Sequence, residues 1–375
     1  MQFREIDELY LYELLKNFGT SIIGVFIPIY ILAQGLTIYH AGLFIIISGF
    51  VSLILSYPVS RFIAKEGFKH GLAISYLFII PGLILIQLSE LTTALIVASS
   101  LLYNLGRIMH NISMNAEFAT DSEEDSRGSD SGKMLSIPSI SRIIAPVLGG
   151  TVFATLGFHT LLLISITFLA LSVIPLMLTG DHRDPMEYSF VDLAEYDLRE
   201  ILPVFVSRGV DAVSSVDVFS VFIFLIIGGT IDVGWVRALD SLGFVVTGFF
   251  TGMIIQRYGR KTPLMVGALG NGIISLGRGF IATPIQAFFL SFLGGIMFQI
   301  YHVPLYSQFA DVAEESDVLE FYTLRKIFVG MGNILVVTTL FTGVHLFNMQ
   351  TGFQMVFILG AMAMAIIALK GDIEI

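Results

Sequence analysis

Charged and histidine side chains occur inside several long apolar stretches of this 375-residue sequence. An ionisable group in the middle of a membrane-spanning helix costs about 2.5–3.5 kcal/mol on insertion scales, so such a group is expected to have a partner or a function. Arg107, His110 and Arg142 occupy the first half of the chain, and the second half carries acids as well as bases. Side chains of these types can bind a polar solute, exchange a proton or neutralise one another.

The spacing of the acids indicates which of these roles each one has. Arg208 precedes Asp211 by three residues, and Arg237 precedes Asp240 by three, so each pair can meet on one helix face. We favour a structural role for both pairs. Asp217 lies on a different face from Asp211 and has no cation nearby in the sequence, which makes it the first candidate for proton exchange. Asp240 and Asp211 are the further candidates if their pairs are not purely structural.

The composition indicates what surrounds these groups. Apolar residues make up 55% of the chain and charged residues 13%, with a mean hydropathy of +0.83. Soluble domains carry about 25% charged residues, so the composition indicates that lipid covers most of this protein. The twelve apolar segments of helical length lie near 10–34, 38–64, 70–88, 91–116, 134–156, 159–179, 201–227, 232–256, 262–281, 284–309, 320–344 and 350–370.

Basic residues alternate between the connections of these segments, as expected if alternate connections face the cytoplasm. One set of connections contains Lys65, Lys69, Arg127, Lys133, Arg183, Arg199, Arg257, Arg260 and Lys261. The connections near 35–38, 89–91, 157–160, 228–232, 282–284 and 346–350 contain no Lys or Arg. The pattern predicts an all-α membrane protein of twelve transmembrane helices with both termini in the cytoplasm.

The two halves of the chain repeat each other. The sequence from Phe118 to Asp125 follows the fourth segment, and a similar sequence from Phe309 to Ser316 follows the tenth, roughly 190 residues later. Six crossings return the chain to its starting side, so the halves are expected to be parallel six-helix repeats, with a site at their interface. The predicted domains are an N-terminal bundle at 1–180, a cytoplasmic linker at 181–200 and a C-terminal bundle at 201–375.

Two motifs and this topology resemble the major facilitator superfamily of transporters. The motif Gly252-x-x-x-Gln256-Arg257-x-Gly259-Arg260-Lys261 matches the family pattern Gly-x-x-x-Asp-Arg-x-Gly-Arg-Arg/Lys except that Gln256 replaces the acid. The second motif, Ala145-Pro146-x-x-Gly149-Gly150, resembles the family's Gly-Pro-x-x-Gly-Gly. The resemblance implies that the first motif is a cytoplasmic gate, and Gln256 leaves the strength of that gate open. It also implies that the first, second, fourth and fifth segments of each half line a central cavity.

The candidate substrate-binding residues follow from this arrangement. Arg107 and Arg142 are expected to receive an anionic or zwitterionic group of the substrate. His110 shares a helix face with Arg107, and Tyr301 aligns with His110 across the repeat, so Tyr301 and His302 complete the predicted site.

We therefore predict a secondary active transporter that moves a small solute by alternating access and is coupled to protons. A passive facilitator or lipid flippase on the same fold is the alternative, and a membrane-embedded enzyme that uses His110, Asp217 and His302 is a more distant one. The sequence contains no cysteine, no phosphate-binding loop and no metalloprotease or nucleophile-elbow motif. We expect no enzyme activity, cofactor, metal or nucleic-acid partner, and a monomer in the lipid of the plasma membrane.

Overall fold

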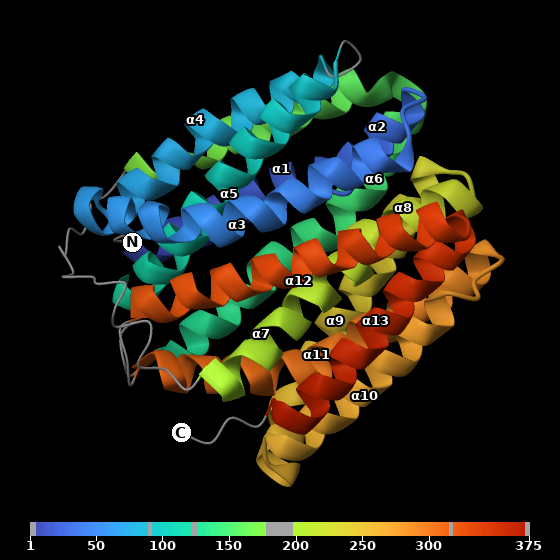
Figure 1. The fold of residues 1–375 in the computed structure, drawn as a ribbon. Coiled ribbons are helices and arrows are strands. Elements are labelled where there is room, and N and C mark those ends of the chain that lie inside the picture. The colour runs from blue at the N-terminus through green and yellow to red at the C-terminus, as the bar shows by residue number, and fades with distance from the viewer. Residues whose placement is uncertain (1–4, 89–91, 122–126, 178–197, 315–317, 372–375) are drawn as a thin grey trace.

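The computed structural model describes residues 5–88, 92–121, 127–177, 198–314 and 318–371, and every regular element in these ranges is helical (Figure 1). The first half contains α1 (Glu5–Ile23), α2 (Phe26–Ala33), α3 (Ile38–Glu66), α4 (Phe68–Gln87), α5 (Thr93–Asp121), α6 (Arg127–Ser172) and the short η1 (Pro175–Met177). The second half contains α7 (Leu198–Ala212), the π-helix η3 (Val213–Val218), α8 (Phe219–Ile226), α9 (Thr230–Tyr258), α10 (Lys261–Arg278), α11 (Pro284–Glu314), α12 (Val318–Leu346) and α13 (Met349–Lys370).

Each apolar segment of the sequence coincides with helix in the structure. The segment near 10–34 is divided between α1 and α2, and α6 contains two predicted segments that Gly157 separates. The backbone of Gly157 has φ 82°, a left-handed conformation that favours glycine. Among the described residues, eight helices are long and apolar enough to cross a membrane, or nine if the bent pair Thr230–Gly248 and Phe250–Tyr258 counts as one span. The chain is therefore an integral membrane protein, and twelve crossings with cytoplasmic termini stay a prediction.

The helices form two groups that meet along two helix pairs. In the first group α1 packs on α6, and α5 packs on α3 and α4; in the second, α11 packs on α9 and α10, and α13 on α7, α10 and α12. The two groups contact each other mainly through α3 with α12 and α6 with α9. Figure 1 shows α12 running beside α3 along this junction. The predicted domain division at 180 and 200 stays a prediction, and residues 181–197 of the predicted linker lie outside the described residues.

Glycines allow the two groups to approach closely. A Cβ atom on Gly49 of α3 would lie 2.7 Å from the carbonyl oxygen of Gly330 in α12, and the reverse contact is equally short. A Cβ atom on Gly234 of α9 would lie 2.5 Å from the carbonyl oxygen of Pro146 in α6. Thr230, the first residue of α9, donates a hydrogen bond of 3.0 Å to the carbonyl oxygen of Gly150. The contacts of Gly234 and Gly150 lie toward the helix ends that the loop charges predict to be extracellular, whereas Gly49 and Gly330 lie near the middle of α3 and α12.

One residue of the predicted cytoplasmic connections lies inside the fold instead. Lys69 belongs to α4, is buried, and forms an ion pair of 3.6 Å with Glu117 of α5. This pair was not predicted, because a lysine at a predicted helix end cannot be told apart in the sequence from a lysine that marks sidedness.

The predicted sidedness can be tested with cysteines, since the chain has none. Ala282, before α11, and Lys65, in the last turn of α3, are both exposed and are predicted to face opposite sides of the membrane. In intact cells an impermeant thiol reagent is expected to label Ala282→Cys and to spare Lys65→Cys until the cells are opened. Labelling of both variants in intact cells, or the reverse pattern, would contradict the twelve-span topology.

Candidate substrate cavity

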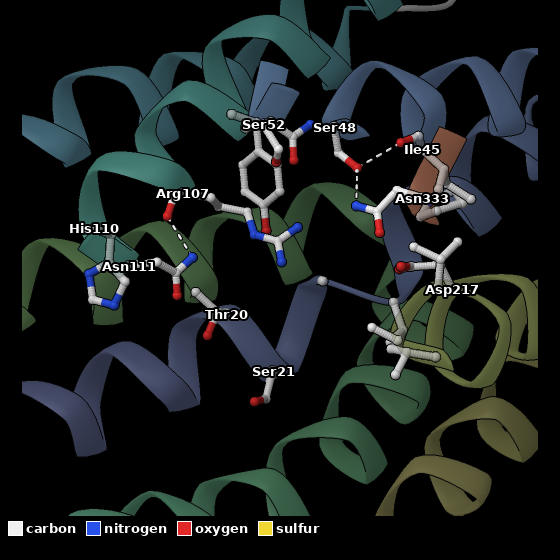
Figure 2. A pocket seen from close by; sticks show the side chains of 18 of the residues that line it. Thr20, Ser21, Ile45, Ser48, Ser52, Arg107, His110, Asn111, Asp217 and Asn333 are labelled. Carbon is white, nitrogen blue, oxygen red and sulfur yellow. Dashed lines mark hydrogen bonds between the residues drawn. The ribbon is translucent and has the colours of Figure 1, made fainter. Parts of the chain in front are cut away.

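A cavity of about 470 Å³ lies between the two groups of helices. It is lined by side chains of both groups, as Figure 2 shows in part (Figure 2). The first group contributes residues of α1, α3, α5 and α6, and the second contributes residues of η3, α9 and α12. Pockets of about 300–1,000 Å³ are typical of small-molecule sites. The sequence repeat predicts a site at the interface of the two halves, and its assignment to this cavity stays a prediction.

The lining of this cavity is rich in cations. Five basic side chains contribute to it: Lys16, Arg107, Arg142, Arg237 and Lys326. Asp217 is the sole carboxylate residue among the lining residues that the structure describes. Of the predicted substrate-binding residues, the structure therefore brings Arg107, Arg142 and His110 together at one cavity.

Asp217 belongs to η3, the π-helical turn between α7 and α8. π-Helical turns are rare and occur frequently at functional sites. Its carboxyl group is half-buried, and within the described part of the chain it forms no hydrogen bond or ion pair. Arg107 and Arg237 are the cations whose charges act on it. Figure 2 shows Asp217 and Arg107 on opposite sides of the cavity.

His110 connects α5 to α1 in the first group. Its Nδ1 atom lies 2.7 Å from the hydroxyl oxygen of Tyr12, and its Nε2 atom lies 3.3 Å from Oε1 of Glu13. Glu13 also forms an ion pair of 3.2 Å with Lys16, three residues later, and accepts a hydrogen bond from Asn17. Both ring nitrogens of His110 are thus occupied, so His110 lines the cavity while it holds two helices together.

Tyr301 has the equivalent position in the second group. Its hydroxyl accepts a hydrogen bond of 2.6 Å from Arg208 and donates one of 2.5 Å to Asp211. Arg208 and Asp211 form the predicted pair at 2.7 Å, and Asn271 donates to the other carboxylate oxygen at 3.0 Å. Tyr301 therefore joins α11 to α7 as His110 joins α5 to α1, which agrees with the alignment of the two residues across the repeat.

Several other predicted site residues lie away from the cavity lining. Tyr301 is fully buried, and neither it nor Asp211 is among the lining residues. His302 is also absent from the lining; its ring stacks on Phe298 and Tyr306, at centroid distances of 4.7 Å and 5.7 Å. Periodicity placed these side chains on one face of a helix, but the neighbouring helix that covers that face could not be known from the sequence.

Asp240 is held by cations on either side. It forms the predicted ion pair with Arg237, at 3.4 Å, and the charge of Arg278 in α10 also acts on it. Arg278, in the last turn of α10, is buried, and its guanidinium lies 4.6 Å from the ring centre of Phe219. Because Asp240 is paired and lies outside the cavity lining, Asp217 is the better placed acid for proton exchange.

Two basic residues of α12 were missed in the sequence analysis. Lys326 lines the cavity, and Arg325 lies against the rings of Tyr306, Phe309 and Tyr322. The signal was present, because Arg325 and Lys326 stand inside the apolar segment 320–344. Their position near its beginning made them resemble flanking residues of a cytoplasmic connection.

The predicted gate lies at the end of α9. Gly259 ends this helix with φ 73°, which explains the glycine, and a Cβ atom on Gly252 would meet no atom within 4 Å. The polar residues of the motif, Gln256, Arg257, Arg260 and Lys261, are all exposed. Gly252 is therefore not at a close helix contact in this conformation, and its predicted role in gating stays untested.

The Arg208–Asp211–Tyr301 cluster is expected to stabilise the second group of helices. Asp211→Asn leaves the buried Arg208 guanidinium without its counter-charge, and breaking a buried pair in this way costs about 3–5 kcal/mol. The expected result is a large fall in the midpoint of thermal unfolding of the purified protein. Asp240→Asn is the matched control with a smaller expected fall, because Asp240 is more exposed. Equal falls in the two variants would contradict a dominant structural role for Asp211.

No protein-family model matches the sequence, and no curated protein matches it at a significant level. Solved structures do match. The crystal structure of a Major Facilitator Superfamily transporter, FucP, in the outward conformation superposes with a TM-score of 0.70 at 16% sequence identity, covering 98% of this chain and 97% of that one. The chain has the major facilitator superfamily fold. Since the match covers nearly all of both chains, it includes both groups of helices.

Proposed function

We propose that this protein is a secondary active transporter that moves a small solute across the plasma membrane by alternating access. The observation that carries the proposal is a cavity between two groups of helices, lined by charged residues of both groups. A solute held there contacts both groups at once, so a change in their relative position exposes it to one side and then the other. The likeness of the fold to FucP, a transporter, supports this reading over an enzyme.

Arg107 and Arg142 are proposed to bind an anionic or zwitterionic group of the solute. Both line the cavity, and neither has an ion pair in the described part of the chain. A guanidinium group presents several N–H donors in a plane and binds carboxylates and phosphates in a bidentate manner. One chain supplies both groups of helices, so the proposed working unit is a monomer surrounded by lipid.

Asp217 is proposed to carry the coupled proton. A carboxyl group that faces the cavity without a paired cation is the kind of intramembrane acid found in proton relays. Protonation of Asp217 removes a negative charge from a cavity that binds an anion, so proton and anion binding reinforce each other through a shared coupling free energy. Because each ligand favours binding of the other, proton and anion cross the membrane together in the same direction, which is symport. The passive facilitator and the flippase require no such acid.

Uptake into proteoliposomes tests the proposal. The purified protein is reconstituted, an inward pH gradient is imposed, and labelled solutes are offered, with carboxylates and phosphate esters first. Accumulation above the external concentration that collapses when the gradient is dissipated is the expected result. Equilibration without accumulation would support the facilitator instead, and movement of labelled phospholipid between the leaflets would support the flippase.

A further inference from the structure

Within the described part of the chain, three of the five cations in the cavity are not neutralised by an ion pair. Lys16 is paired with Glu13 and Arg237 with Asp240, which neutralises both. Arg107, Arg142 and Lys326 form no ion pair within the described residues. Arg107 is exposed to the cavity, and Arg142 and Lys326 are half-buried.

These cations come from three helices on both sides of the junction between the groups. Arg107 is on α5 and Arg142 on α6, whereas Lys326 is on α12 of the second group. Arg107, Lys16 and Arg325 all repel the Lys326 ammonium group. Like charges that share a cavity of low dielectric cost free energy unless an anion neutralises them. A bound anion would therefore relieve repulsion between the two groups of helices as well as satisfy each cation.

The charge balance specifies the anion. Against the three unpaired cations the lining provides the single carboxylate of Asp217, so two positive charges are in excess when Asp217 is ionised. We propose that the solute is a small organic dianion, a dicarboxylate or a phosphate monoester, and that Lys326 binds it from the second group of helices opposite Arg107 and Arg142. This inference rests on the proposed transport function, because it names the transported solute, but measurements of binding alone can test it. Thr20, Ser21 and Asn111 provide neutral polar groups for the remainder of the solute.

The test is the thermal stability of the purified full-length protein with defined probes. Ligands that bind the native state raise the unfolding midpoint in proportion to the logarithm of concentration over Kd. Succinate and glycerol 3-phosphate represent the two kinds of dianion, and succinamide and glycerol are their neutral analogues. Sulfate at the same ionic strength shows the general effect of a divalent anion. At least one organic dianion is expected to raise the midpoint by several degrees, and the neutral analogues are expected to have no effect.

Substitutions assign this effect to the cavity. Lys326→Gln is expected to weaken dianion binding at least tenfold, and Lys326→Arg is expected to retain it. Arg61→Gln makes a similar change of charge at an exposed position of α3 outside the cavity and is expected to bind like the unmodified protein. Stabilisation by neither organic dianion, equal stabilisation by sulfate, or unchanged binding in Lys326→Gln would each overturn the inference.

The failure of this inference differs from the failure of the proposed function. If a neutral or cationic solute is accumulated in proteoliposomes and the dianions do not bind, the proposed transport function is supported and the proposed dianionic substrate is wrong. If a dianion binds through Lys326 but is not moved across the bilayer, the proposed binding site is supported and the proposed transport function is wrong.

Discussion

The Asp217→Asn variant is expected to lose accumulation driven by a pH gradient and to retain exchange of labelled for unlabelled solute. Accumulation requires a proton to cross with the solute, and asparagine cannot exchange one at this position. Each unit of pH gradient supplies about 1.4 kcal/mol, which is roughly tenfold accumulation for one coupled proton. Exchange requires only that the loaded cavity change sides, so its rate is expected to stay close to that of the unmodified protein.

The same carboxyl group determines how solute binding depends on pH. When ionised, Asp217 repels an anion in the cavity, and protonation removes this repulsion, so anion binding is expected to tighten as the pH falls. For charges roughly 8 Å apart at an effective dielectric constant of about 20, the repulsion is roughly 2 kcal/mol, or tenfold or more in Kd. Asp217→Asn is expected to bind at every pH as the protonated protein does.

Asp240→Asn is the matched control for both measurements. It removes a carboxylate of the second group that is paired with Arg237 and lies outside the cavity lining. It is expected to retain gradient-driven accumulation and the pH dependence of binding. If Asp217→Asn accumulates solute normally under a pH gradient, proton coupling through Asp217 is wrong, and a facilitator or another coupling ion explains the transport better.

The Gly330→Leu variant is expected to fold but to lose most of its transport, by more than tenfold. A Cβ atom on Gly330 would lie 2.7 Å from the carbonyl oxygen of Gly49 and 2.8 Å from the Cβ atom of Ser52. The leucine side chain therefore cannot fit between α3 and α12 while the two helices are in contact. The two groups are expected to separate along the α3–α12 contact, which opens the cavity to solvent at this junction.

A cysteine at Ser21, which lines the cavity, reports this shift. An impermeant thiol reagent outside the cell is expected to label Ser21→Cys faster when Gly330→Leu is also present. Gly252→Leu is the contrasting variant, because a side chain at Gly252 meets open space in this conformation. Gly252→Leu is expected to preserve or favour the conformation of this structure and therefore to slow the labelling of Ser21→Cys. Unchanged labelling in a folded Gly330→Leu variant would show that the α3–α12 contact does not control access.

The sequence alone determined the helices and the pairs within one helix. Apolar length predicted the long helices that the structure describes, because a membrane requires about 20 apolar residues for each crossing. The three-residue spacing predicted the ion pairs of Asp211 and Asp240. It did so because neighbours three apart on a helix face each other whatever surrounds the helix. The repeat also placed His110 and Tyr301 in equivalent positions.

The tertiary structure alone decided which of these groups face the solute cavity. Tyr301 and Asp211 bond to each other across α7 and α11, whereas Asp217 is left open to the cavity. Lys326, which lies near a predicted helix end in the sequence, lines the same cavity as Arg107 because α12 packs on α3 of the other group. Periodicity specifies the face of a helix that a side chain occupies. The neighbour on that face depends on contacts between residues far apart in the chain, which the packing of the two groups creates.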